Sequence, residues 1–173
     1  IDSGYDKSHP DLPSSAAVVT GEAQPSTGAW DAPGDSHGTH VAGTIAAVSN
    51  DIGVVGVDRN PGLSIHVVKV FDDDGQWTWS SDLIAALDSC VNAGSNVINM
   101  SLGGGYASSF EEQAFAAAAA GTSSRPGVLS IAAAGNSGDS SLSYPASYAS
   151  VVSVAAVDSQ KELAGFSTRN EFV

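Results

Sequence analysis

Two histidines, His37 and His40, stand three residues apart at the start of a predicted helix. Helical spacing of three puts them on neighbouring positions of one helix face. An imidazole titrates near neutral pH, so a histidine held at a helix start can act as a general base. Gly38 follows His37 and lets backbone amides come close to a reacting group. A pair of core or capping histidines is the alternative interpretation.

Polar residues stand at the ends of three predicted strands, at Asp2, Ser101 and Asn136. In an open parallel sheet, functional groups gather at the carboxyl ends of the strands. Asp2 could orient the imidazole of His37 and stabilise its charged form. The amide of Asn136 could donate to a developing oxyanion. The backbone of 101–103 could pair with an extended peptide. With His37 at its helix start, these residues are expected to converge on one rim of the sheet.

The elements that must position these residues alternate between strands and helices. Strands are predicted at 64–71, 96–101, 128–134 and 151–157, after a strand that ends within residues 1–4. Helices are predicted at 37–48, 79–93 and 110–120, a tight loop at 50–57, and a surface connection without strands at 14–36. Such alternation implies βαβ units and an α/β fold with a parallel sheet covered by helices on both faces. Residues 1–173 are expected to form one domain, or a piece of one.

Composition excludes some classes of partner. The 173 residues contain 6 basic and 19 acidic side chains, which gives a net charge of −13. Such a chain repels nucleic acid and anionic membranes, so we expect neither as a partner. No apolar run approaches the ~20 residues of a membrane span, and no basic-then-apolar leader is present. The single cysteine, Cys90, lies in an apolar helical pattern and is expected to be a buried, inert thiol.

Four motifs, in this order, make the sequence similar to the subtilisin-like serine proteases, the subtilases, over essentially its whole length. They are Ile1-Asp2-Ser3-Gly4 with His9-Pro10-Asp11-Leu12, then Ser36-His37-Gly38-Thr39-His40-Val41-Ala42-Gly43, then Val97-Ile98-Asn99-Met100-Ser101-Leu102-Gly103-Gly104, then Ala134-Gly135-Asn136. The stretch around His37 is the most specific of them. The resemblance implies a subtilisin-like, three-layer fold that is incomplete at both ends, with 1–173 as the central part of a catalytic domain.

The resemblance also implies roles for particular residues. Asp2 is expected to be the triad aspartate, His37 the triad base and Asn136 the oxyanion donor. One wall of the substrate cleft is expected to consist of Ser101, Leu102 and Gly103. Trp77 falls where the family lines its outer substrate pockets, although a structural aromatic is an equally good interpretation. The implied protein is a secreted, extracellular serine endopeptidase that acts on extended proteins or peptides, expected to be monomeric, with an inhibitory propeptide outside this sequence as a further candidate partner.

A structural calcium site belongs to the same resemblance. Its implied ligands are the Asp11 carboxylate, the side-chain oxygen of Asn50 and the carbonyls of Val48, Ile52 and Val54. Ligands that are all oxygens suit Ca²⁺, although a glycine loop without metal is the alternative. The run 72–74 of three aspartates could hold a further ion, but a charge run is more often a solvated turn.

The triad serine is missing from the sequence. In this family the triad runs Asp, His, Ser along the chain, and the serine lies in a Gly-Thr-Ser-Met-Ala-like stretch. No such stretch follows Asn136. The similar letters at Gly121-Thr122-Ser123 are interpreted as a turn that ends a helix. We therefore expect the nucleophile outside this sequence and the chain as given to be inactive alone.

Two other functions compete with the endopeptidase. One is a non-catalytic fragment that binds extended peptides or an inhibitor, but such a module has no need of intact Asp2, His37 and Asn136. The other is a zinc hydrolase that uses His37 and His40 with Asp2. The zinc hydrolase is disfavoured because His40 is expected to face the packed side of its helix and no glutamate stands beside the pair.

Overall fold

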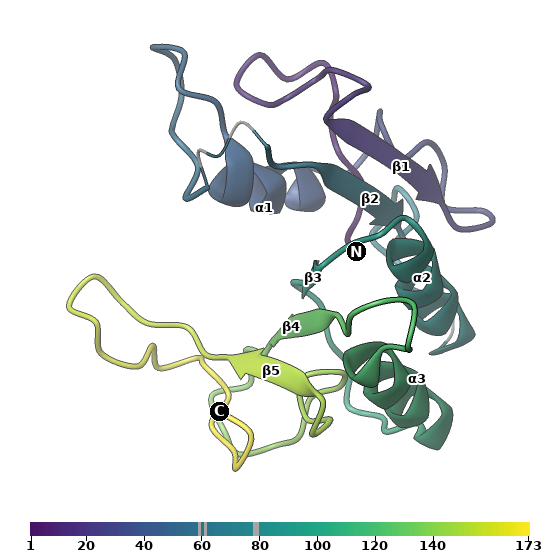
Figure 1. The fold of residues 1–173 in the computed structure, drawn as a ribbon. Helices are drawn as coiled ribbons and strands as arrows, with labels where there is room; N and C mark the ends of the chain where they lie inside the picture. Colours follow the sequence, from purple (N-terminus) through teal and green to yellow (C-terminus); the bar gives the residue numbers. More distant parts are fainter. Residues whose placement is uncertain (59, 61, 78–79) are drawn as a thin grey trace. The chain divides into compact units, whose positions relative to one another are not determined.

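The computed structural model describes residues 1–58, 60, 62–77 and 80–173. These residues form two compact units, Ile1–Ala93 and Gly94–Val173, which Figure 1 colours from purple to teal and from teal to yellow. The expectation that residues 1–173 make one domain stays a prediction. No helix among the described residues has both the length and the apolar character that a membrane crossing requires.

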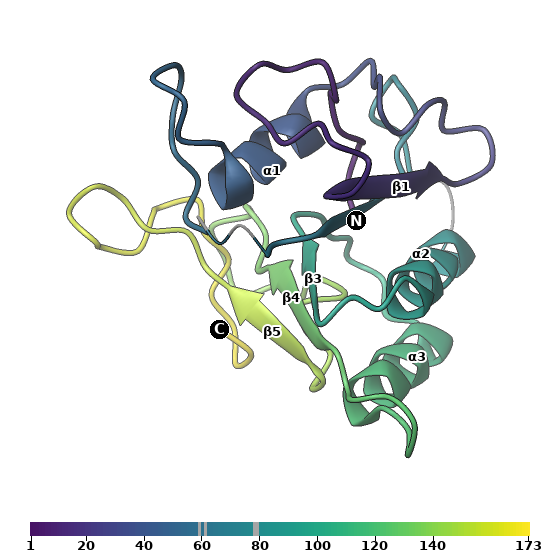
Figure 2. The ribbon, with the colours of Figure 1, turned by 45° about the horizontal axis from the view of Figure 1, so that its top comes forward.

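Unit 1 contains a parallel pair of strands between two helices (Figure 2). Its elements are β1 (Val19–Ala23), α1 (His37–Ala46), β2 (Ile65–Lys69) and α2 (Ser80–Asn92). Val19 and Val67 pack with Ala47, at the end of α1, in one hydrophobic cluster. His66 alternates with Val67 along β2, so its ring points the other way, and its Nε2 lies 3.3 Å from Ser89 Oγ on α2. The two helices therefore lie against opposite faces of the strand pair.

β1 corrects the prediction that 14–36 is a surface connection. The strand pairs with β2 in parallel from Val19 opposite Ile65 to Ala23 opposite Lys69. Its sequence, Val-Thr-Gly-Glu-Ala, has one buried residue, Val19, and its β-branched side chains end at Thr20, before Gly-Glu-Ala. The backbone of β2, rather than the propensity of its own residues, holds β1 in the sheet.

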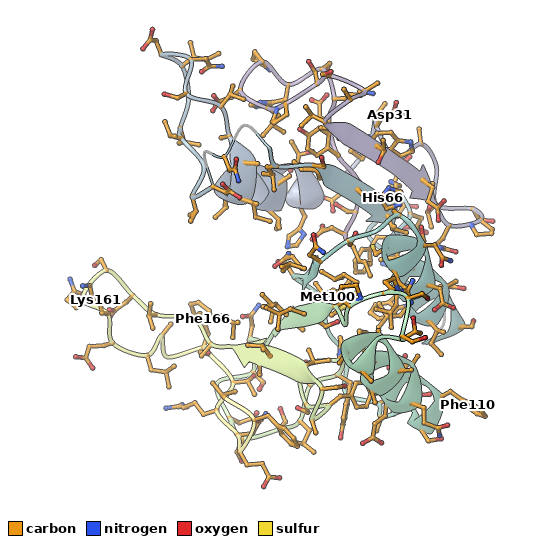
Figure 3. The ribbon with its side chains drawn as sticks, in the orientation of Figure 1. Asp31, His66, Met100, Phe110, Lys161 and Phe166 are labelled. Carbon is orange, nitrogen blue, oxygen red and sulfur yellow. The ribbon has the colours of Figure 1, made fainter. Side chains whose placement is uncertain are left out.

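Unit 2 contains three parallel strands in the order β3-β4-β5, with α3 packed against β4. Its elements are β3 (Val97–Met100), α3 (Ser109–Ala120), β4 (Leu129–Ala133) and β5 (Val151–Val154). Met100 is buried on β3, whereas Phe110 projects into solvent from α3 (Figure 3). α3 ends at Gly121 as predicted, and Thr122 and Arg125 close the following turn.

The predicted helices and the strands after residue 60 are confirmed apart from their ends, whereas the strand expected to end within residues 1–4 is an isolated parallel bridge at Asp2. α1 ends at Ala46 and β5 at Val154, both earlier than predicted. Trp79, the predicted first residue of the second helix, lies outside the described residues. Cys90 is buried on α2, and this burial raises the pKa of its thiol, as expected of an inert core cysteine.

Candidate active site

Asp2 and His37 are brought into contact in unit 1. Asp2 pairs in parallel with Lys69, so it stands beside the carboxyl end of β2, and His37 is the first residue of α1. His37 Nδ1 lies 2.6 Å from Asp2 Oδ1. Because a carboxylate only accepts hydrogen bonds, this contact assigns the ring proton to Nδ1 and leaves Nε2 as a base. The Asp2 side chain is 8% exposed and the His37 side chain 52%, so the pair has one buried and one accessible end.

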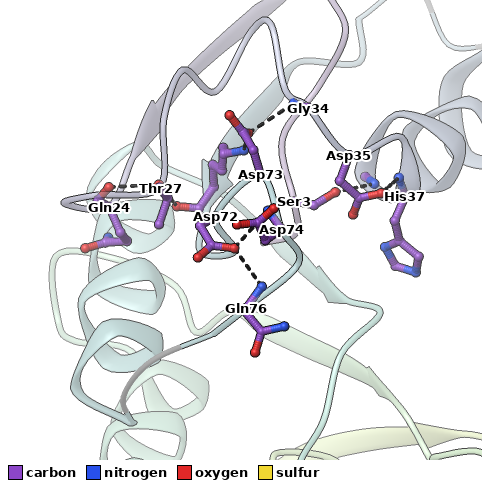
Figure 4. A network of polar contacts seen from close by, with 12 residues as sticks. Ser3, Gln24, Thr27, Gly34, Asp35, His37, Asp72, Asp73, Asp74 and Gln76 are labelled. Carbon is purple, nitrogen blue, oxygen red and sulfur yellow. Dashed lines mark hydrogen bonds and ion pairs between the residues drawn. The ribbon is translucent and has the colours of Figure 1, made fainter.

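Three contacts hold the start of α1 against the loop after Asp2, and a fourth, from Asp35, lies within the helix start itself. The N–H of Gly38 donates to Ser3 Oγ at 2.9 Å, and the N–H of Asp6 donates to Thr39 Oγ1 at 2.9 Å. Asp35 Oδ1 accepts from the N–H of His37 at 3.2 Å (Figure 4). A Cβ on Gly38 would lie 2.3 Å from the carbonyl oxygen of Gly4, so only glycine allows this approach. The contacts of the Ser3 and Thr39 hydroxyls were not predicted, because a serine or threonine that hydrogen-bonds a neighbouring loop carries no sequence signature.

The two oxygens of the Asp2 carboxylate differ in their partners. Oδ1 accepts from His37 and, at 2.7 Å, from the backbone N–H of Ser3. Oδ2 is buried and has no hydrogen-bond partner in the described part of the chain. A buried carboxylate oxygen without a donor is costly, so this oxygen is a point where a further donor would bind strongly.

His40 does not face the packed side of α1, and that prediction was wrong. Its side chain is exposed and lines an open cavity of about 780 Å³, together with His9, Asp11 and Thr39. Packing at the start of α1 is made by Gly38 instead, which is small enough for backbone contact. The described residues hold no group of three or more His, Cys, Asp or Glu side chains that could bind a metal, so the zinc alternative gains no support.

Asn136 lies in unit 2, in the loop that follows β4. Gly135 has a φ of +106°, and its carbonyl accepts from the N–H of Thr168 at 3.0 Å. Hydrogen bonds from Ser137 and Ser141 lower the pKa of Asp139 to about 2. The same hydrogen bonds hold the part of the loop that follows Asn136 in place. The Asn136 side chain is exposed and makes no hydrogen bond in the described part of the chain, so its amide is free to donate to a ligand.

The predicted cleft wall, 101–103, follows β3 in unit 2 and lies outside the strand ladder. Leu102 is buried, whereas Gly103 is exposed. The next residue, Gly104, exchanges two backbone hydrogen bonds with Tyr144, at 2.9 and 2.8 Å, and so anchors the stretch. Ser101 Oγ accepts from Asn99 Nδ2 at 3.1 Å. Substrate binding by this wall stays a prediction.

Trp77 lies in unit 1 and packs edge-to-face on Phe71, with ring centroids 5.9 Å apart and planes at 87°. This contact suits the structural interpretation of Trp77, and its place in a substrate pocket stays a prediction.

The predicted calcium loop wraps around Asp11, whose side chain is buried with the residue 4% exposed. Asp11 Oδ2 accepts from the N–H of Val54 at 2.8 Å, and the Asp11 carbonyl accepts from the N–H of Val48 at 2.9 Å. Asn50 Oδ1 accepts from the N–H of Ile52 at 3.3 Å. Asp11 Oδ1 is buried with no partner among the described residues. An orphaned, buried carboxylate oxygen, on a residue that N–H groups of this loop hold in place, is a ligand of the kind that calcium takes.

The three aspartates at 72–74 do not act alike. Asp73 Oδ1 forms an ion pair with Lys69 Nζ at 2.6 Å, and Asp72 Oδ1 accepts from the N–H groups of Asp74 and Gln76 (Figure 4). The ion pair has a local signal, a lysine four residues before an aspartate, but nothing in the sequence shows that the lysine is buried. The run is a hydrogen-bonded turn, and a second ion there gains no support.

Comparison with known proteins agrees with this geometry. The model of the subtilase family matches residues 1–173. Subtilisin DY of Bacillus licheniformis is 42% identical over 172 residues, which are 97% of this chain and 58% of that protein. Subtilisin BL of Lederbergia lenta is 46% identical over 169 residues, which are 96% of this chain and 57% of that protein. The chain thus spans about half the length of the relatives that it matches.

A solved structure extends the likeness to the fold. The chain superposes with a TM-score of 0.87 and 54% identity on the psychrophilic subtilisin-like protease Apa1 from the Antarctic psychrotroph Pseudoalteromonas sp. AS-11, covering 99% of this chain and 38% of that one. The predicted subtilisin-like α/β fold with parallel strands is therefore confirmed. With an aspartate and a histidine hydrogen-bonded at the predicted positions, and a family match along its whole length, this chain belongs to the subtilase family.

Proposed function

We propose that the protein to which this chain belongs is a serine endopeptidase whose triad serine lies outside residues 1–173. The observation that carries the proposal is the 2.6 Å bond between His37 Nδ1 and Asp2 Oδ1 in a member of the subtilase family. The bond holds the imidazole in the tautomer that a serine protease requires.

The proposed reaction uses three side chains of this sequence. His37 Nε2 takes the proton of the serine hydroxyl as its oxygen attacks the scissile carbonyl, and later gives that proton to the leaving amine. Asp2 keeps the Nδ1 proton in place and stabilises the imidazolium. The free amide of Asn136 donates to the oxyanion of the tetrahedral intermediate. The backbone of 101–103 pairs with an extended substrate.

An exposed apolar sheet face supports the view that more polypeptide takes part. One face of the parallel strands of unit 2 carries four apolar side chains that are each about half exposed, namely Val97, Leu129, Val152 and Val154. A contiguous apolar face of this kind is typical of a surface that another segment covers. We propose that polypeptide outside residues 1–173 covers this face and supplies the serine.

We also propose a structural calcium ion at the loop around Asp11. The Asp11 carboxylate, the Asn50 side-chain oxygen and the carbonyls of Val48, Ile52 and Val54 would hold it. Bound calcium would neutralise the buried Asp11 carboxylate and stiffen the loop that follows α1, without entering the reaction.

Partners and location follow from the same proposal. The substrates are unfolded or extended proteins and peptides, the enzyme is a secreted, extracellular monomer, and an inhibitory propeptide outside this sequence binds the cleft. Support comes from family membership and from the net charge of −13, which disfavours nucleic acid and anionic membranes.

The test is hydrolysis of casein by the full-length protein and by two histidine variants. His37→Ala is expected to lower kcat/KM by more than about 10³-fold, since it removes the general base. His40→Ala is the matched control, because His40 lies exposed on the same helix and takes no part in the pair. Full activity of His37→Ala would contradict the proposal. A wild-type protein that binds casein without cleaving it would favour the non-catalytic, peptide-binding alternative.

A further inference from the structure

Lys69 is a buried cation that the proposed reaction does not use. It is the last residue of β2 and has no exposed surface. Asp2 is its partner in a parallel bridge, since the N–H of Asp2 donates to Val68 and the N–H of Val70 donates to Asp2. Partners in adjacent strands project from the same sheet face, about 4.8 Å apart. The side chains of Lys69 and Asp2 therefore leave the backbone at adjacent positions on the same face.

The ammonium is turned away from Asp2 by a residue in the loop after β2. Lys69 Nζ contacts Asp73 Oδ1 at 2.6 Å, and the same oxygen accepts from the N–H of Gly34 at 3.0 Å (Figure 4). The Asp73 side chain is 57% exposed, whereas that of Lys69 is fully buried. The two hydrogen bonds and the lysine charge hold the pKa of Asp73 below its ordinary range, so Asp73 stays anionic.

Asp2 offers this lysine a second acceptor. Its Oδ2 is buried and has no partner among the described residues. A buried ammonium without a counter-ion is strongly unfavourable, so loss of Asp73 would drive Lys69 to another carboxylate. Asp2 is bridged to Lys69 in parallel, so the two side chains project from the same face, and the length of a lysine side chain exceeds the spacing of paired backbones.

We propose that Asp73 is a positioning residue: as the counter-ion of Lys69 it keeps the ammonium away from Asp2, so that the Asp2 carboxylate serves His37 alone. An ammonium on Oδ2 would withdraw negative charge from Oδ1 and weaken its bond to His37 Nδ1. This inference rests on the proposed function only in treating Asp2 and His37 as the reacting pair.

The test uses Asp73→Asn in the full-length protein. The side-chain oxygen of asparagine can still accept from the N–H of Gly34, so the variant removes the charge and keeps the loop contact. We expect the low-field NMR resonance of the His37 Nδ1 proton to move upfield and kcat/KM on a peptide substrate to fall at least about tenfold, mainly in kcat. Spectra are recorded well below the melting temperature of every variant.

A second variant and a control isolate the charge of Lys69. The double variant Lys69→Met with Asp73→Asn is expected to restore both the resonance and kcat/KM, because no ammonium remains to reach Asp2. Asp74→Asn changes the charge of the exposed neighbouring residue, whose backbone N–H, rather than its side chain, donates to Asp72, and is expected to behave as wild type.

Two results would overturn the inference. One is an Asp73→Asn variant with lower thermal stability but an unchanged resonance and kcat/KM. Asp73 would then stabilise its loop without any effect on Asp2. The other is a double variant no better than Asp73→Asn. If the resonance responds as expected while no form of the protein hydrolyses peptides, the inference stands and the proposed function falls.

Discussion

Gly38 sets the distance between α1 and the loop that carries Asp2. A Cβ at this position would lie 2.3 Å from the carbonyl oxygen of Gly4 and 3.0 Å from Asp2 Oδ1. The first contact is with backbone, which cannot rotate away. In Gly38→Ala, the helix start must therefore retreat by at least about 0.7 Å to reach the shortest separation that real Cβ atoms show.

We expect this displacement to lower kcat/KM strongly and the free energy of unfolding only slightly. His37 precedes Gly38 directly, so its 2.6 Å bond to Asp2 would stretch beyond the usual range of about 2.7 to 3.2 Å. A misplacement of about 1 Å can cost 10²-fold in rate, and we expect a loss of about that size in kcat/KM. Overpacking costs about 1 to 3 kcal/mol, but alanine regains up to about 1 kcal/mol in a helix. The free energy of unfolding should fall by only about 0 to 2 kcal/mol.

Gly43→Ala is the matched control on the same helix. A Cβ there would meet Leu12 Cδ2 at 3.7 Å, an ordinary contact, so we expect a gain of about 0.5 to 1 kcal/mol and no change in kcat/KM. Both variants are measured by denaturant unfolding and by peptide hydrolysis in the full-length protein. Wild-type kcat/KM in Gly38→Ala would refute the claim that this backbone contact positions His37.

Three further predictions concern charge and metal. Asp2→Asn should lower kcat by about 10⁴-fold in peptide hydrolysis, because the amide can present a donor to Nδ1 and favour the wrong tautomer. Burial lowers the pKa of His66 from its ordinary 6.5, so the neutral ring contributes stability that is present above pH 6.5 and is lost as the pH falls through the folded-state value. Denaturant unfolding between pH 8 and 5 should show this loss, and His66→Gln should reduce it. Calcium at 100 times its Kd should add about 2.7 kcal/mol to the free energy of unfolding, a gain that chelation or Asp11→Asn removes.

Local sequence patterns predicted the helices and strands whose own residues favour that secondary structure. α2 and α3 show apolar spacing or alanine-rich sequence, and β2 has a run of β-branched residues, so each was found within a few residues of its ends. β1 was not predicted, because its sequence shows no sustained strand pattern and its pairing with the backbone of β2 is visible only in the structure. A strand stabilised from outside leaves little trace in its sequence.

In the candidate site, too, some features were predicted from local motifs and others depend on the tertiary structure. The contact between Asp2 and His37 follows from their motifs, and the structure confirms that the two side chains meet. The orientation of His40 was wrong because helical spacing alone does not tell which face the tertiary structure covers. Burial of Lys69 depends on loops from distant parts of the chain, so its ion pair with Asp73 became significant only in three dimensions. Whether Asn136 meets the pair stays a prediction.

The most direct test of the central claim is labelling of the full-length protein with an organophosphonate, which reacts with activated serines, followed by intact-mass analysis and peptide mapping. We expect one adduct, on a serine outside residues 1–173, that disappears in His37→Ala and persists in His40→Ala. Absence of any adduct on the wild-type protein, or an adduct on a serine within residues 1–173, would contradict the claim.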